Sequence, residues 1–156
     1  MRLSELLTEE RVAIGHNGAD HPLDKPAALR ALAQMLARGA KADPAVVERV
    51  LTEREQLQST GIGEGVAIPH GALQQLESQF AALLIVPEGL DFTAIDGLAV
   101  NILFAVITPK RATGEHLKTL ARVSRLLRSK GFRERLVGAQ GSKEAYDLIA
   151  TEEGDR

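Results

Sequence analysis

Hydrophobic residues recur at a helical spacing in four segments of the chain. One runs from about Lys25 to Arg38, where apolar positions at i, i+3, i+4 and i+7 predict an amphipathic helix that Gly39 ends. The same spacing predicts helices that begin at Thr113 and at Ser142. The first helix has Leu29, Leu32, Ala33 and Leu36 at this spacing, and the second has Leu117, Leu120, Ala121, Ser124 and Leu127 on one face. The third is expected to bury Ala145, Leu148 and Ile149.

The fourth helical segment opens with a start signal. Asp43 is a good N-cap residue, and Pro44 at the first helical position already has the φ that a helix needs. The apolar stripe that follows consists of Val47, Val50 and Leu51 and continues at position 54, which holds an arginine. A guanidinium on the apolar side of a helix must find a partner or reach the helix end.

Strands are predicted in the middle of the chain. The continuous apolar runs 80–86 and 100–107 are typical of strands covered on both faces. Short strands are predicted at 11–14, 65–68 and 91–95, and residues 15–24 read as a loop. Turn residues between the two long runs argue against an all-parallel sheet. The pattern predicts an α/β fold, a mixed β-sheet of about five strands flanked by helices on both sides.

Composition narrows the class of protein. With 156 residues, the chain suits one domain spanning 1–156, with a core of about 5–151. The absence of cysteine removes disulfides and thiolate chemistry and fits a reducing cytoplasm. The net charge of −2 gives no footprint for nucleic acid, and the basic run 122–135 reads as a solvated helix face. No signal peptide or membrane-spanning run is visible, so a cytoplasmic protein that is not membrane-embedded is expected.

The segment Ser59–Gly71, STGIGEGVAIPHG, is rich in glycine and holds one histidine, His70. Pro69 fixes the chain just before this histidine, and Gly71 after it leaves room at the imidazole. These features predict a histidine in an open surface turn, in a site shaped by Gly61, Gly63, Gly65, Pro69 and Gly71. Turn chemistry alone also explains such glycines. The spacing matches neither a dinucleotide fingerprint nor a P-loop.

Two further residues are candidates for the same site. Arg54 lies just before the glycine loop and is suited to an anion near His70, because a guanidinium binds phosphate oxygens in pairs. If Thr113 caps its helix, His116 is the third helical residue, where free N–H groups and the helix dipole favour an anion and a neutral imidazole. Either side chain also has a plain structural interpretation, as a packed stem with a solvated head or a polar residue beside an apolar stripe.

The remaining histidines carry no comparable signal. His16 and His21 lie in the loop 15–24 and are interpreted as solvated. A metal-dependent hydrolase using His70, His116 and carboxylates is one alternative, but the chain has no HxxxH or HxH pair. The sequence therefore predicts neither a metal nor a cofactor.

The run from Arg54 to Gly71 resembles the enzyme IIA components of the bacterial phosphoenolpyruvate-dependent phosphotransferase system, of the fructose/mannitol superfamily. The runs LDFTAIDGLAVNILFAVITP (90–109) and GEHLKTLARVSRLL (114–127) resemble the same family in the same order, and the likeness extends from about residue 25 to 150. The resemblance implies a mixed sheet flanked by helices. It also implies that His70 is phosphorylated and that His116 and Arg54 support the phosphoryl group.

The resemblance also implies partners. The donor would be an HPr-type phosphocarrier protein or its nitrogen-branch equivalent, NPr. The motif STGIGEGVAIPHG favours the nitrogen-regulatory branch, in which phosphorylation switches contacts with regulatory targets. Two alternatives stay open: a free-standing IIA subunit of a fructose/mannitol-type transporter that passes phosphate to a IIB domain, and a protein-docking module that is never phosphorylated.

Overall fold

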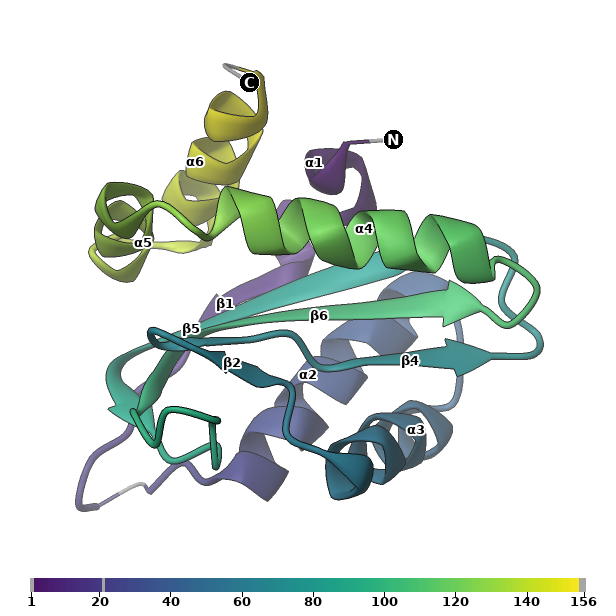
Figure 1. Cartoon of the computed structure of the whole chain (residues 1–156), viewed down its shortest axis with the longest axis horizontal. Coiled ribbons are helices and arrows are strands. Elements are labelled where there is room, and N and C mark those ends of the chain that lie inside the picture. The colour runs from purple at the N-terminus through teal and green to yellow at the C-terminus, as the bar shows by residue number, and fades with distance from the viewer. Residues whose placement is uncertain (1, 21, 155–156) are drawn as a thin grey trace.

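A mixed sheet forms the centre of the molecule in the computed structural model, which describes residues 2–20 and 22–154 (Figure 1). Its main path has the strand order β1-β5-β6-β3-β2, and β4 also pairs with β6. The strands are β1 (Val12–Ile14), β2 (Gly61–Gly63), β3 (Val66–Ala67), β4 (His70–Leu73), β5 (Phe80–Leu90) and β6 (Val100–Pro109). Antiparallel pairing joins β5 to β6 and β2 to β3. Parallel pairing joins β1 to β5 and both β3 and β4 to β6, so the predicted mixed sheet is confirmed.

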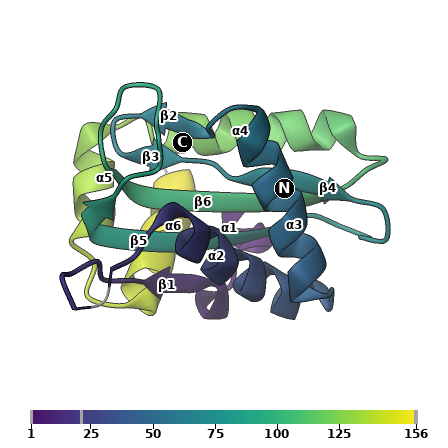
Figure 2. The ribbon, with the colours of Figure 1, turned by 90° about the horizontal axis from the view of Figure 1, so that it is seen from below.

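Helices cover both faces of this sheet. One face carries α2 (Lys25–Ala40) and α3 (Pro44–Leu57), which lie in front of the strands in Figure 2. The opposite face carries α4 (Thr113–Leu126), α5 (Lys130–Val137) and α6 (Ser142–Gly154), together with the short helix α1 (Leu3–Leu6) (Figure 1). The 3-10 helix η1 (Glu9–Arg11) contacts both α2 and α6. The prediction of helices on both sides is therefore confirmed.

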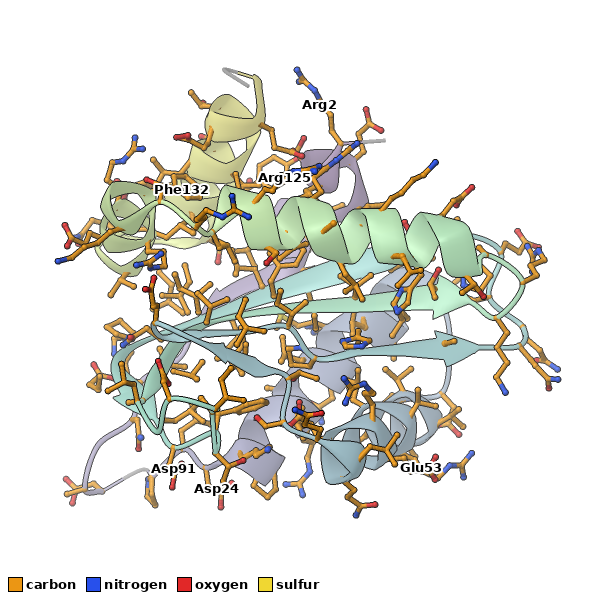
Figure 3. The ribbon with its side chains drawn as sticks, in the orientation of Figure 1. Arg2, Asp24, Glu53, Asp91, Arg125 and Phe132 are labelled. Carbon is orange, nitrogen blue, oxygen red and sulfur yellow. The ribbon has the colours of Figure 1, made fainter. Side chains whose placement is uncertain are left out.

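The long strands are apolar throughout because each face meets a helix layer. Along β5, Ala82, Leu84 and Val86 join the core under α2 and α3, while the residues between them join the core under α4, α5 and α6. Strand β6 alternates in the same way, and its Phe104 is fully buried. Phe132, labelled in Figure 3, packs α5 into the core on the α4 side of the sheet.

The two ends of the described chain are joined on the α4 side. The Glu153 carboxylate of α6 accepts hydrogen bonds from the backbone N–H groups of Leu3 and Ser4, at 2.6 and 2.8 Å. The Tyr146 hydroxyl donates to the carbonyl oxygen of Ser4 at 2.7 Å. Because Leu3 and Leu6 are buried, this junction adds α1 to the core.

Two sequence predictions about secondary-structure elements were wrong. Residues 91–95 do not form a strand, because Thr93 has a φ of +54° and Asp91 accepts a hydrogen bond from its N–H, which turns the chain after Leu90. Gly39 does not end its helix, which continues to Ala40 and stops at Lys41 in the left-handed region. Gly39 instead makes room for another residue, because an added Cβ would lie 2.5 Å from Nη1 of Arg11.

Several elements carry too weak a pattern to be predicted. The short segments α1, η1, β2 and β4 were not expected. The basic run 122–135 spans two helices, because Ser129 caps a new helix, α5, by accepting a hydrogen bond from the N–H of Phe132. Residues 15–24 form the expected loop as far as they are described; His16 is exposed and contacts Glu88 at 3.0 Å, and His21 lies outside the described residues. Within residues 2–20 and 22–154, no helix has the length and apolar character that crossing a bilayer demands.

Candidate functional site

His70 is the first residue of β4, directly after a break in the sheet ladder. Strands β3 and β4 both pair with β6, and Ile68 and Pro69 separate them. Proline has no N–H to donate to a ladder, so β3 cannot run on into β4 without interruption. The ring of His70 is part-exposed beside β6. The sequence predicted this histidine in an open surface turn, whereas the structure places it at the start of a strand.

Two hydrogen bonds define the tautomer of His70. The Nδ1 atom lies 2.7 Å from the carbonyl oxygen of Ile68, and because a carbonyl only accepts, Nδ1 carries the proton. Nε2 lies 3.2 Å from Nε of Arg54, whose N–H only donates, so Nε2 is the acceptor. Both contacts give the same result: the lone pair of the neutral ring is on Nε2.

Arg54 reaches His70 from the last turn of α3. Asp43 caps this helix by accepting from the N–H of Ala45, and the buried Val47 and Leu51 hold it against the sheet. Besides its contact with His70, the guanidinium donates from Nη1 to the carbonyl oxygen of Gln58 at 2.8 Å. A cation is therefore fixed at the helix end and beside the nucleophilic atom of the ring.

His116 approaches the same ring from α4. The two imidazole centroids are 5.4 Å apart, with the planes tilted by 53°. The prediction that Thr113 caps this helix was wrong: Ala112 is the N-cap residue, His116 is the fourth helical residue, and its N–H already donates to the carbonyl oxygen of Ala112. His116 therefore offers its side chain to the site, and its backbone N–H is occupied.

Electrostatics keep both rings neutral near pH 7. Burial lowers the pKa of His70, the hydrogen bond to Ile68 raises it, Arg54 lowers it and Glu55 raises it, and the net pKa is below the usual 6.5. Burial, and next the charge that His70 can carry, lower the pKa of His116 to about 4. Among the described residues, Nδ1 of His116 is buried and has no hydrogen-bond partner.

The glycines around His70 serve close packing more than access. A Cβ on Gly71 would lie 2.3 Å from Cγ1 of Val50, so this glycine lets α3 approach β4. The space beside it is taken by Val50 of the helix that carries Arg54, and its expected role beside the imidazole stays a prediction. A Cβ on Gly61 would lie 2.8 Å from Cβ of Ala94, which explains the glycine beside the 91–99 loop.

Gly63 and Gly65 shape the turn between β2 and β3. Their φ values are +103° and +84°, and Glu64 between them has a φ of +56°. An added Cβ would meet Asp96 at Gly63 and Asn101 at Gly65, not a residue of the His70 cluster. The structure thus brings together His70, Arg54 and His116, while these two glycines act on the neighbouring hairpin.

One buried charge of this region was missed from the sequence. Glu55 follows Arg54 and is only 8% exposed. A signal for it existed, because Val47, Leu51 and Glu55 occupy positions i, i+4 and i+8 on one helix face, and a carboxylate there must find partners. No group of three or more His, Cys, Asp or Glu side chains suited to a metal ion occurs within residues 2–20 and 22–154.

Acid is expected to destabilise the fold through the histidines. Below pH 6.5 an unfolded chain binds a proton at His116, whereas the folded chain excludes it until about pH 4, so the free energy of unfolding falls as the pH decreases across this window. Denaturant unfolding at pH 7 and pH 5 measures this loss. His116→Asn should lose less stability than the parent chain over that interval. Equal losses in the two chains would contradict the prediction.

Comparison with known proteins agrees with this geometry. Residues 5–152 match the family model described as "Phosphoenolpyruvate-dependent sugar phosphotransferase system, EIIA 2". A nitrogen regulatory protein from Pseudomonas aeruginosa is 33% identical over 150 residues, covering 96% of this chain and 95% of that protein. The crystal structure of nitrogen regulatory protein IIA-Ntr from Neisseria meningitidis has a TM-score of 0.85 at 29% identity, covering 94% of this chain and 98% of that one. A complex of enzyme IIAMtl and phosphorylated enzyme IIBMtl from Escherichia coli shares the fold, with a TM-score of 0.76 at 21% identity, covering 94% and 99%.

The chain belongs to the EIIA type 2 family of the phosphoenolpyruvate-dependent phosphotransferase system, and its class is that of a phosphotransfer domain. The match to nitrogen regulatory proteins over almost their whole length indicates the branch of this family. It is an EIIA phosphocarrier of the nitrogen-regulatory branch, so the family and the branch predicted from the sequence are both confirmed.

Proposed function

We propose that Nε2 of His70 accepts a phosphoryl group from an HPr-type or NPr-type phosphocarrier protein and holds it as a regulatory signal. The observation that carries this proposal is the single tautomer of the ring, with the proton on Nδ1 and the lone pair on Nε2. A nucleophile needs a free lone pair at the operating pH, and the lowered pKa of His70 provides it near neutrality.

The reaction balances without an added acid or base. The lone pair of Nε2 attacks the phosphorus of a donor phosphohistidine, a new N–P bond forms, and the N–P bond of the donor breaks. The donor ring departs as a neutral imidazole when it was protonated on its other nitrogen. The product ring on this chain keeps its proton on Nδ1, where the carbonyl oxygen of Ile68 accepts a hydrogen bond and stabilises the positive charge.

Arg54 and His116 are assigned to the phosphoryl oxygens. Arg54 must release Nε2 when the phosphorus approaches, and its anchor on the carbonyl oxygen of Gln58 keeps the guanidinium within the site. The planar guanidinium then has N–H donors for two of the oxygens. A neutral His116 supplies one N–H donor from the adjacent ring. Fixed donors of this kind stabilise charge that spreads over three oxygens during transfer.

Exposed apolar side chains support docking of a protein donor at this site. Five large ones are exposed in the described part of the chain: Leu57, Ile62, Ile95, Leu98 and Leu117. Leu57 and Leu117 belong to the helices that supply Arg54 and His116. Ile95 lies beside β2, where its N–H donates to the carbonyl oxygen of Gly61. Exposed apolar side chains that gather in a patch mark a candidate surface for contact with another protein.

The rest of the proposal concerns organisation and readout. We assign residues 1–156 to one such domain acting in the cytoplasm, without a metal or a cofactor, on the support of the matched span 5–152. Phosphorylation of His70 adds close to two negative charges to one patch of the surface. Regulatory targets distinguish the two forms through that change; transfer onward to a IIB domain remains the alternative acceptor step.

A labelling experiment tests the function. Incubation with phosphoenolpyruvate, enzyme I and an HPr-type carrier is expected to place one phosphoryl group on each chain, in a bond that acid cleaves and alkali does not. Omission of enzyme I should remove the label. Nitrogen-15 spectra of the labelled chain should show phosphorus on Nε2 with the proton still on Nδ1. A chain that stays unlabelled would favour the docking module, which binds partners without being phosphorylated.

A further inference from the structure

A buried ion pair lies behind the His70 site. The Oε2 atom of Glu55 is 2.8 Å from Nζ of Lys25, and the Glu55 side chain is almost fully enclosed. Lys25 is the first residue of α2, so the pair joins the start of one helix to the end of the next. A buried pair of this kind adds little net stability, because desolvation opposes the attraction. Its position calls for a reason other than stability.

Lys25 is held by more than its carboxylate partner. Its ammonium group donates to the carbonyl oxygen of Phe92 at 3.1 Å and to Oγ1 of Thr93 at 2.8 Å, and it lies 4.5 Å from the centroid of the Phe92 ring. Figure 3 shows the neighbouring labelled residues Asp24 and Asp91 at this same corner of the molecule. Three contacts besides the ion pair therefore hold the ammonium group that the Glu55 carboxylate binds.

From Glu55, a continuous series of hydrogen bonds leads to the nucleophilic ring. Oε1 of Glu55 accepts from both the backbone N–H and the hydroxyl of Thr60. The carbonyl oxygen of Thr60 accepts from the N–H of Ile68 at 3.0 Å. The carbonyl oxygen of Ile68 accepts from Nδ1 of His70 at 2.7 Å. Each step holds the residue whose carbonyl oxygen accepts the next hydrogen bond.

We infer that Glu55 is a positioning residue for phosphoryl transfer, which holds the ring of His70 in its reactive tautomer through Thr60 and Ile68. This inference rests on the proposed role of His70. Without an acceptor at position 55, the buried N–H of Thr60 loses its partner, and residues 59–61 must move to find another. That movement shifts Ile68 and weakens the bond that keeps the proton on Nδ1.

Two double variants separate positioning from stability. Lys25→Met/Glu55→Gln removes the ion pair but keeps an amide oxygen that accepts from Thr60. Lys25→Met/Glu55→Leu removes the ion pair and the acceptor together. Both lose the contacts of Lys25 with Phe92 and Thr93, so the two variants differ only at position 55, where Gln keeps an acceptor for Thr60 and Leu does not. Melting curves fix a temperature at which both chains are folded.

The expected result is a difference between the two variants. Lys25→Met/Glu55→Gln should be phosphorylated at close to the parent rate, while Lys25→Met/Glu55→Leu should be slower by roughly 10- to 100-fold, because misplacement of a reacting group by about 1 Å has effects of that order. Nitrogen-15 spectra should show the proton of His70 on Nδ1 in the Gln variant and shared between both ring nitrogens in the Leu variant. Equal rates and equal tautomer populations would overturn the inference.

The spectra also separate this inference from the proposed function, because they need no phosphoryl donor. If the parent chain takes up no phosphoryl group, the proposed function fails, and the tautomer comparison still decides whether Glu55 positions the ring.

Discussion

Replacement of His70 by alanine is expected to abolish phosphoryl uptake while leaving the chain folded. The ring is part-exposed and lies at the start of an edge segment of the sheet, so its loss removes little buried contact. It supplies the only lone pair that the proposed reaction uses. The measurement is transfer of label from phosphoenolpyruvate through enzyme I and an HPr-type carrier, with circular dichroism as the check on folding.

His16→Ala is the matched control for that experiment. His16 is also an imidazole in contact with a charged side chain, Glu88, but it is exposed in a loop and makes no contact with Arg54 or His116. It should be labelled as fast as the parent chain. A label that persists after His70→Ala would assign the phosphoryl group to another residue and remove the basis of the mechanism.

Gly71→Ala is expected to give the largest loss of stability among single-methyl changes near the site. The added Cβ would lie 2.3 Å from Cγ1 of Val50, well inside contact distance, so α3 and β4 must separate. Overpacking of this kind destabilises by about 1–3 kcal/mol. Because α3 carries Arg54 and β4 carries His70, the same change should also slow phosphoryl uptake. Denaturant unfolding and the labelling rate measure the two effects.

Removal of the opposing methyl group should relieve the clash. The double variant Val50→Ala/Gly71→Ala is expected to lose less stability than the sum of its two single variants, which identifies direct contact as the cause. Gly18→Ala is the control, since a Cβ at that position would meet nothing within 4 Å. Strict additivity of the Val50 and Gly71 changes would show that the two elements do not meet as described.

The sequence predicted the parts of this fold where many residues give the same signal. The runs 80–86 and 100–107 became the buried strands β5 and β6 because an all-apolar segment fits only between two helix layers. Asp43 and Pro44 correctly predicted where α3 begins, since capping depends on neighbouring residues alone. For the site, the stripe position of Arg54 correctly indicated a guanidinium in need of a partner.

The rest depends on contacts between residues far apart in the chain. The glycine at position 39 makes room for Arg11, which lies on another element, and does not end the helix. Residues 91–95 have the composition of a strand, but they turn because Thr93 adopts a left-handed conformation. The series from Lys25 through Glu55 and Thr60 to His70 joins residues on two helices and the segment that follows them. No local pattern indicates such a series before the fold is known.

The hydrogen bond between His70 and Ile68 has a consequence for how the carrier responds in the cell. The bond formed and the bond broken in the proposed transfer are of the same kind, and the Nδ1 proton keeps its place before and after. Because no bond type is lost, the proposed transfer can also run backward to the donor. At equilibrium, the phosphorylated fraction of this protein then follows the phosphorylated fraction of the donor protein. Such a chain suits a sensor of metabolic supply better than an irreversible step.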